Sequence, residues 1–118
     1  MNRLALNNPP VQLGANTTWK PIADSGSLDI DPHQTIMVMD ETAANLLGFD
    51  RQRTIGYNVW DILCASLPAY HHQAVNAAIN NREKGVIRTR LSKVDIPVFL
   101  TVVPRGNGYI TITISKIS

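Results

Sequence analysis

The side chains that could carry chemistry in this sequence are two adjacent histidines, one cysteine and scattered carboxylates and hydroxyls. His71 and His72 fall within a predicted helix. At 100° per residue, His71 shares a helical face with Val75, and His72 flanks Val75 on its other side. We therefore expect at least one imidazole to face the interior, where it could bind a metal or act as a hydrogen-bonded helix residue.

Cys64 is the only cysteine, which excludes an internal disulfide and a multi-cysteine zinc site. The simplest interpretation of Cys64 is a small buried hydrophobic residue. The absence of a disulfide framework favours a reducing compartment, and we expect a cytoplasmic protein.

The remaining polar residues do not predict a catalytic or metal site. Asp29 and Asp31 share the outer face of an alternating strand, where carboxylates are solvated. Ser25, Ser27 and His33 include hydrolase residue types, but no glycine-x-serine-x-glycine elbow accompanies them. The domain itself is therefore not expected to be an enzyme.

Length and composition indicate one globular domain, with 118 residues, 44% hydrophobic and 17% charged. The net charge of +2 comes from dispersed basic residues, so no direct nucleic-acid binding is expected. No apolar run approaches the ~20 residues that a membrane crossing needs, so no membrane insertion is expected.

The first part of the chain predicts an arm followed by a hairpin. Residues 1–26 are rich in Pro, Gly, Asn, Ser and Thr, and they form either an irregular arm or cap or a partner-binding segment. The domain is expected over residues 27–118. Within it, alternating residues 28–31 and the apolar run 35–39 predict two paired strands.

Short helices follow the hairpin. Asp40 can cap a helix over 41–47 that Gly48 ends. Single helical turns are predicted over 50–56 and 58–63.

A longer helix is predicted over 69–83. Pro68 suits its first turn, Gly85 follows its end, and Arg82 lies near its negative terminus.

The last third of the chain predicts three strands, over 86–91, 97–103 and 109–114. The alternation in the final strand places isoleucines on one face and threonines on the other, so one face of the sheet packs and the other is open. The predicted fold is α+β, a five-stranded antiparallel sheet with short helices and one longer helix on one face.

Three segments in this order resemble the PAS sensory domains, over residues 27–117. Residues 40–49, DETAANLLGF, are similar to the family's asparagine-x-x-alanine-x-x-leucine-leucine-glycine-aromatic signature. Residues 54–63 and 109–117 resemble its following isoleucine-glycine segment and its closing strand. Asp40 stands where the family more often has asparagine, and either side chain can cap a helix. The resemblance implies a ligand-sensing or dimerising signalling module without catalytic residues of its own.

The resemblance also implies which cofactors to test. Val59 stands where the light-sensing flavin class carries its reactive cysteine, and valine cannot form the thiol adduct. Cys64 lies two residues too near the preceding glycine for the photoactive yellow protein class, whose chromophore partners align with Met39 and Ala43. The sequence therefore predicts no coloured cofactor of either class.

Haem is the remaining cofactor alternative. His71 and His72 lie on the helix that carries the axial histidine of haem-binding relatives, although that histidine aligns nearer Ala74. Branched residues beside both histidines are expected to fill the space that a macrocycle needs.

Three functions follow from the resemblance. The first is a small-molecule sensor, the second a ligand-free interaction and dimerisation module, and the third a haem-binding gas or redox sensor. Bulky aliphatic residues favour a small or absent pocket. The candidate pocket residues are Ile36, Val38, Ala44, Leu47, Trp60, His71, His72, Val75, Ile79, Val98, Leu100, Ile110 and Ile112.

Two kinds of partner are expected. The resemblance implies an effector, such as a kinase, a cyclase or a transcription regulator, in the same or a partner chain, and this chain would be the N-terminal sensory piece. We also predict a homodimer that uses residues 1–26 and the uncharged solvent side of the last strands. That side carries Phe99, Thr101, Val103, Thr111 and Thr113.

Overall fold

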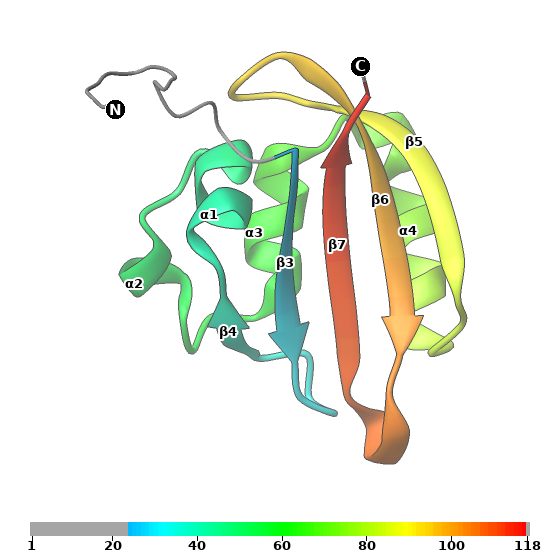
Figure 1. Cartoon of the computed structure of the whole chain (residues 1–118). Helices are drawn as coiled ribbons and strands as arrows, with labels where there is room; N and C mark the ends of the chain where they lie inside the picture. The colour runs from blue at the N-terminus through cyan, green and yellow to red at the C-terminus, as the bar shows by residue number, and fades with distance from the viewer. Residues whose placement is uncertain (1–23, 118) are drawn as a thin grey trace, which may run out of the picture.

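The computed structural model describes residues 24–117, which form a five-stranded antiparallel sheet in the order β4-β3-β7-β6-β5 (Figure 1). The strands are β3 (Ser25–Ile30), β4 (Ile36–Met39), β5 (Gly85–Leu91), β6 (Ile96–Pro104) and β7 (Ile110–Lys116). The helices are α1 (Glu41–Leu47), α2 (Arg51–Thr54), α3 (Val59–Ser66) and α4 (His72–Asn80), with 3₁₀ turns η1 (Ala69–His71) and η2 (Gly106–Gly108). The predicted α+β fold is confirmed, and the first strand begins two residues before the predicted domain start. The predicted arm lies largely outside the described residues.

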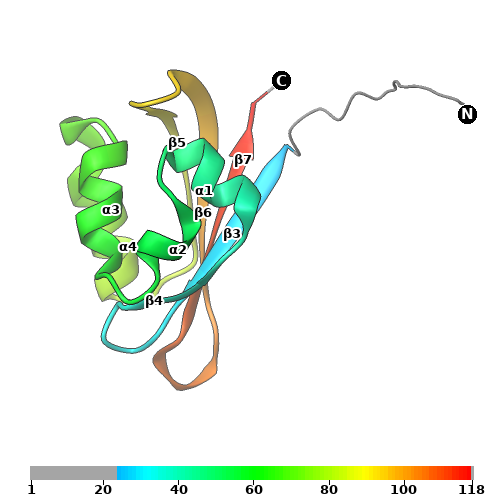
Figure 2. The ribbon, with the colours of Figure 1, turned by 90° about the vertical axis from the view of Figure 1, so that its left-hand side faces the viewer.

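All four helices lie on one face of the sheet, as the edge-on view in Figure 2 shows. A single apolar core fills the space between the two layers, built from the inward residues of all five strands and from one stripe of each of α1, α3 and α4. The opposite face of the sheet carries no helix in the described part of the chain.

Asp40 joins the helical layer to the sheet. Its Oδ1 accepts the Ala43 N–H at 2.7 Å and caps α1, as predicted, while its Oδ2 accepts the Ser27 N–H of β3 at 2.9 Å. The Asp40 N–H donates in turn to the Ser27 carbonyl at 3.0 Å. The start of α1 comes so close to β3 at this point that a Cβ on Gly26 would lie 2.7 Å from Asp40 Oδ1 and 2.9 Å from Ala43 Cα. Only glycine fits there.

The long helix is shorter than predicted. Residues 69–71 form a 3₁₀ turn, and α4 ends at Asn80 instead of residue 83. The chain leaves the helix through Arg82, whose φ is +52°, while the Glu83 N–H donates to the Ala78 carbonyl and the Arg82 N–H to the Ile79 carbonyl. This is a Schellman ending with arginine in the position that glycine usually occupies. Gly85, predicted to follow the helix end, instead begins β5.

The segment predicted as one turn over 58–63 is a longer helix, α3. Asn58 caps it by accepting the Trp60 N–H at 2.8 Å, and the helix continues through Ser66 because Leu63 and Ser66 extend its buried face. The single turn predicted over 50–56 is present as α2, capped by Asp50.

An ion pair closes the β5–β6 hairpin. Arg90 Nε donates to Asp95 Oδ1 at 2.7 Å, and both side chains are largely exposed. The hydrogen bond and the attraction between opposite charges lower the pKa of Asp95 and raise the pKa of Arg90.

Candidate functional site

The candidate pocket residues lie in the core, and their own side chains occupy it. Nine of them are at most 2% exposed, and Trp60 packs against the same cluster. The nine are Ile36, Ala44, Leu47, Val75, Ile79, Val98, Leu100, Ile110 and Ile112. The structure therefore brings these predicted residues together as packed neighbours.

Val38 is the exception, and its predicted inward position is wrong. Its side chain is 56% exposed, while Ile36 and Met39 are buried. The pairing of β3 with β4 shifts between Asp29 and Ile30, which breaks the simple alternation. Val38 consequently lies on the open face of the sheet, opposite Asp29.

The two histidines are half-buried and hydrogen-bonded. His71 Nδ1 lies 2.6 Å from Thr89 Oγ1 of β5. His72 Nε2 donates to the Leu67 carbonyl at 2.8 Å, and its ring meets Trp60 edge-on at 5.4 Å between centroids. Because the carbonyl can only accept, His72 Nε2 carries the proton and cannot bind a metal in this arrangement. Both rings therefore join helices to neighbouring elements.

Cys64 is exposed, so its predicted burial is wrong. Val59, Ile62, Leu63 and Ser66 form the inward face of α3. Cys64 lies outside that face. The residue type alone does not indicate which side of the helix a cysteine occupies.

The open face of the sheet is defined by the outward residues of its five strands. Cross-strand neighbours place Thr101 beside Thr113, Val103 beside Thr111 and Phe99 beside Ser115. All five residues predicted for this face therefore lie on it. Phe99 is 39% exposed, and the other four are half-buried by their neighbours within the sheet.

A polar depression of about 390 Å³ lies at one end of the open face. Arg105 Nε donates to Thr111 Oγ1 at 3.0 Å, and the Thr111 hydroxyl donates to Asp29 Oδ1 at 2.7 Å. Tyr109, at the end of the β6–β7 hairpin, also lines it. This chain of hydrogen bonds holds one cation and one anion at the rim of the uncharged surface.

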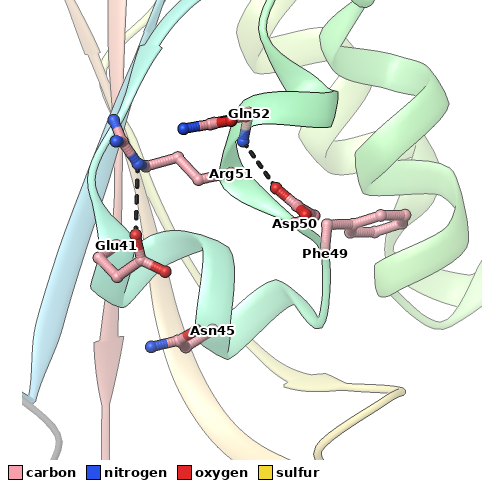
Figure 3. Close-up of a pocket in the computed structure, with 6 residues that line it drawn as sticks. All are labelled: Glu41, Asn45, Phe49, Asp50, Arg51 and Gln52. Atoms are coloured by element: carbon pink, nitrogen blue, oxygen red, sulfur yellow. Dashed lines mark hydrogen bonds and ion pairs between the residues drawn. The ribbon is translucent and has the colours of Figure 1, made fainter.

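A second depression, of about 440 Å³, lies between α1 and α2 (Figure 3). Its lining is polar, and Arg51 Nε pairs with Glu41 Oε1 at 3.3 Å across it. A third, of about 330 Å³, lies beside it and includes Phe49 and Tyr57. These three depressions lie outside the buried cluster between the sheet and the helices. The depression beside Arg105 touches that cluster only at Ile110, and the depression beside Tyr57 touches it only at Ile62.

Residues 24–117 contain no group of three or more His, Cys, Asp or Glu that could hold a metal ion. Over the same residues, no helix is both long and apolar enough to cross a membrane.

Sequence reasoning missed Arg105 and Tyr109 as rim residues of the open face. Arg105 lies in the connection between the predicted strands 97–103 and 109–114, and Tyr109 is the first residue of the second of these, whereas β7 begins at Ile110. Arg105 lies beside Thr111 and Asp29 because of the register among three strands. No local sequence pattern predicts that register.

Comparisons with known proteins identify the fold. No protein-family model matches the sequence, and no curated protein matches it. Solved structures do match: the PAS domain of the fruit-fly ELK potassium channel has a TM-score of 0.61 at 13% identity, covering 80% of this chain and 87% of that one. The Cronobacter turicensis RpfR quorum-sensing receptor PAS domain in complex with C12:0 has a TM-score of 0.59 at 16% identity, covering 81% and 96%.

The photoactive yellow protein domain of the sensor histidine kinase Ppr from Rhodospirillum centenum is also similar, with a TM-score of 0.54 at 18% identity, covering 80% and 86%. These similarities agree with the strand order, the helices on one face and the signature residues around Asp40. Residues 24–117 of this chain therefore have the PAS fold.

Proposed function

We propose that this chain is a PAS-type sensory and signal-transduction module that regulates an effector, in the same or a partner chain, by self-association through the open face of its sheet. The observation that carries the proposal is the centre of that face, where the outward residues of β6 and β7 are uncharged and no helix of residues 24–117 covers them. Outward charges lie on either side of this centre, on Asp29 of β3 and on Arg88 and Arg90 of β5.

The driving force for association is the burial of apolar surface that the open face exposes to water. Phe99, Val38 and Val86 are 39%, 56% and 61% exposed. Fully burying one such side chain contributes about 1.5–3 kcal/mol, of which these partly exposed groups would gain a fraction each. A second copy offers the same apolar and hydroxyl groups and would form a two-fold symmetric contact.

Light scattering tests this proposal at about 100 μM, where a dimer with a micromolar Kd is nearly fully formed. We expect the dimer mass for the whole chain and the monomer mass for Phe99→Glu. Tyr70→Glu is the matched control, because Tyr70 is 76% exposed but lies on the helical side. It should remain dimeric. A monomer mass for the whole chain, both with and without residues 1–23, would refute the proposal.

A second candidate function is binding of an aliphatic acid. The buried cluster between the sheet and the helices consists of hydrophobic residues, and the similar RpfR domain was solved in complex with C12:0. Because packed side chains occupy the interior, such a ligand must displace them. Titration with dodecanoate, followed by methyl NMR, should then shift Ile79 and Leu100. Shifts confined to exposed methyl groups would contradict this candidate.

A further inference from the structure

The two edges of the sheet differ in how they are covered. At the β4 edge, the Ile36 N–H donates to the Tyr57 carbonyl and the Gly56 N–H donates to the Ile36 carbonyl, each at 2.8 Å. Thr35 also forms a β-bridge with Asn58. The segment before α3 therefore satisfies part of the edge of β4, which is only four residues long.

The β5 edge is longer, and no segment of residues 24–117 covers it along its length (Figure 1). The nearest comparable contact lies just past its end, where the Ser92 N–H donates to the Ser66 carbonyl at 2.8 Å. The direction of its peptide groups follows from the register. The Pro97 carbonyl accepts the Ile117 N–H at 3.1 Å, so Pro97 and alternate residues of β6 direct their peptide groups toward β7. The β6 residues between them, including Val98 and Leu100, consequently direct theirs toward β5.

Val98 pairs with Thr89, and Leu100 pairs with Ile87. Thr89 and Ile87 therefore make the backbone hydrogen bonds that join β5 to β6. The intervening residues of β5 must direct their N–H and C=O groups away from the sheet. These residues are Val86, Arg88 and Arg90. Within residues 24–117, their N–H groups donate to no backbone carbonyl.

The side chains of these edge residues add positive charge. Arg88 and Arg90 alternate along the strand, so their guanidinium groups leave the same face of the sheet about 6–7 Å apart along β5. Arg90 pairs with Asp95, whereas Arg88 is exposed and makes no ion pair with any residue between 24 and 117. Two β5 strands placed edge to edge would bring arginines of one copy near those of the other, which is unfavourable.

We propose that the β5 edge binds an extended segment of a partner protein that carries acidic side chains at alternate positions. The backbone of that segment would extend the sheet by hydrogen bonds to Val86, Arg88 and Arg90, and its carboxylates would face the two guanidinium groups. The positive charge of the two arginines disfavours pairing with a second β5 strand and favours an acidic partner. The proposal does not require association through the open face, which Arg88 adjoins beside Phe99.

NMR of the full 118-residue chain, labelled with ¹⁵N, tests the proposal. The probe is a blocked peptide of alternating valine and glutamate, long enough to span β5, and the comparison peptide has lysine in place of glutamate. We expect the glutamate peptide to shift the amides of Val86, Arg88 and Arg90 and to slow their hydrogen exchange. No shift at these amides, or equal shifts with the lysine peptide, would overturn the proposal.

Two variants with the same change of net charge separate a local contact from general attraction. Arg88→Glu should weaken binding of the glutamate peptide roughly tenfold, because it replaces an attractive cross-strand pair by a repulsive one. Arg53→Glu, in the exposed helix α2, should weaken it less than about twofold, because charges far apart in solvent are screened. Equal losses in both variants would show non-specific attraction and refute the edge site.

Discussion

The close contact of β3 with the start of α1 at Gly26 predicts that Gly26→Ala is strongly destabilising. The added Cβ would lie 2.9 Å from Ala43 Cα and 2.7 Å from Asp40 Oδ1, where ordinary carbon contacts need about 3.5–4.0 Å. The nitrogen and Cα of Ala43 are backbone atoms, so no side-chain rotation can relieve the clash with them. The start of α1 would have to move about 1 Å away from β3.

The cost can be estimated from the contacts that this movement breaks. Forced overpacking costs about 1–3 kcal/mol. Weakening the bonds between Asp40 and Ser27, which are 2.9 and 3.0 Å long, adds roughly 1–3 kcal/mol because one of them involves a carboxylate. We therefore expect a loss of roughly 2–6 kcal/mol, a large fraction of the ~5–15 kcal/mol by which domains are stable.

Urea unfolding followed by circular dichroism measures this loss. A domain of this size should also melt at least about 8 °C lower. Gly106→Ala is the matched control, because nothing lies within 4 Å of its Cβ position and its φ is not in the left-handed region. It should change stability by no more than about 0.5 kcal/mol. The reasoning is refuted if both variants unfold at the same urea concentration.

Three further predictions concern exposed residues. Arg82→Asn should stabilise the chain by a few tenths to about 1 kcal/mol in urea unfolding, because asparagine tolerates the φ of +52° at the end of α4 better than arginine; a loss of stability would show that the arginine side chain matters more than its backbone. NMR titration should give Asp95 a pKa below its ordinary value, and Arg90→Gln should restore it. The lowered pKa means that Asp95 stabilises the fold at pH values above its unfolded-state pKa and that this contribution disappears as the pH falls through its folded-state pKa; an unchanged pKa in Arg90→Gln would exclude the ion pair as the cause. Cys64 should react with a thiol reagent in the native state at nearly the rate found in urea, whereas strong protection would contradict its exposure.

The parts of the fold that sequence predicts well are those set by local signals. Asp40 and Gly48 delimit α1 as expected, because the side chain and the left-handed φ of +81° satisfy the helix ends within a few residues. The alternation of isoleucine and threonine in β7 gives both faces of the sheet correctly.

The errors arise where tertiary contacts override the local pattern. Gly85 looks like a helix stop, yet the helix ends earlier through Arg82, a residue that no simple rule places in a left-handed conformation. Val38 is a predicted pocket residue, but Met37 is an extra residue in β4 at the register shift, and Val38 lies on the open face. Within the candidate site, the apolar members could be predicted by type, whereas the link from Arg105 through Thr111 to Asp29 required the sheet order.

The pairing of β3 with β7 also constrains when this domain can form during protein synthesis. Asp29 and Thr111 are neighbours in the sheet but lie 82 positions apart in the chain. At about 5–20 residues per second, a ribosome needs roughly 4–16 s to deliver the second after the first. During that interval β3 and β4 can form only a two-stranded hairpin, which is marginally stable in water. The apolar residues of the nascent hairpin therefore stay available to chaperones until the last strand arrives.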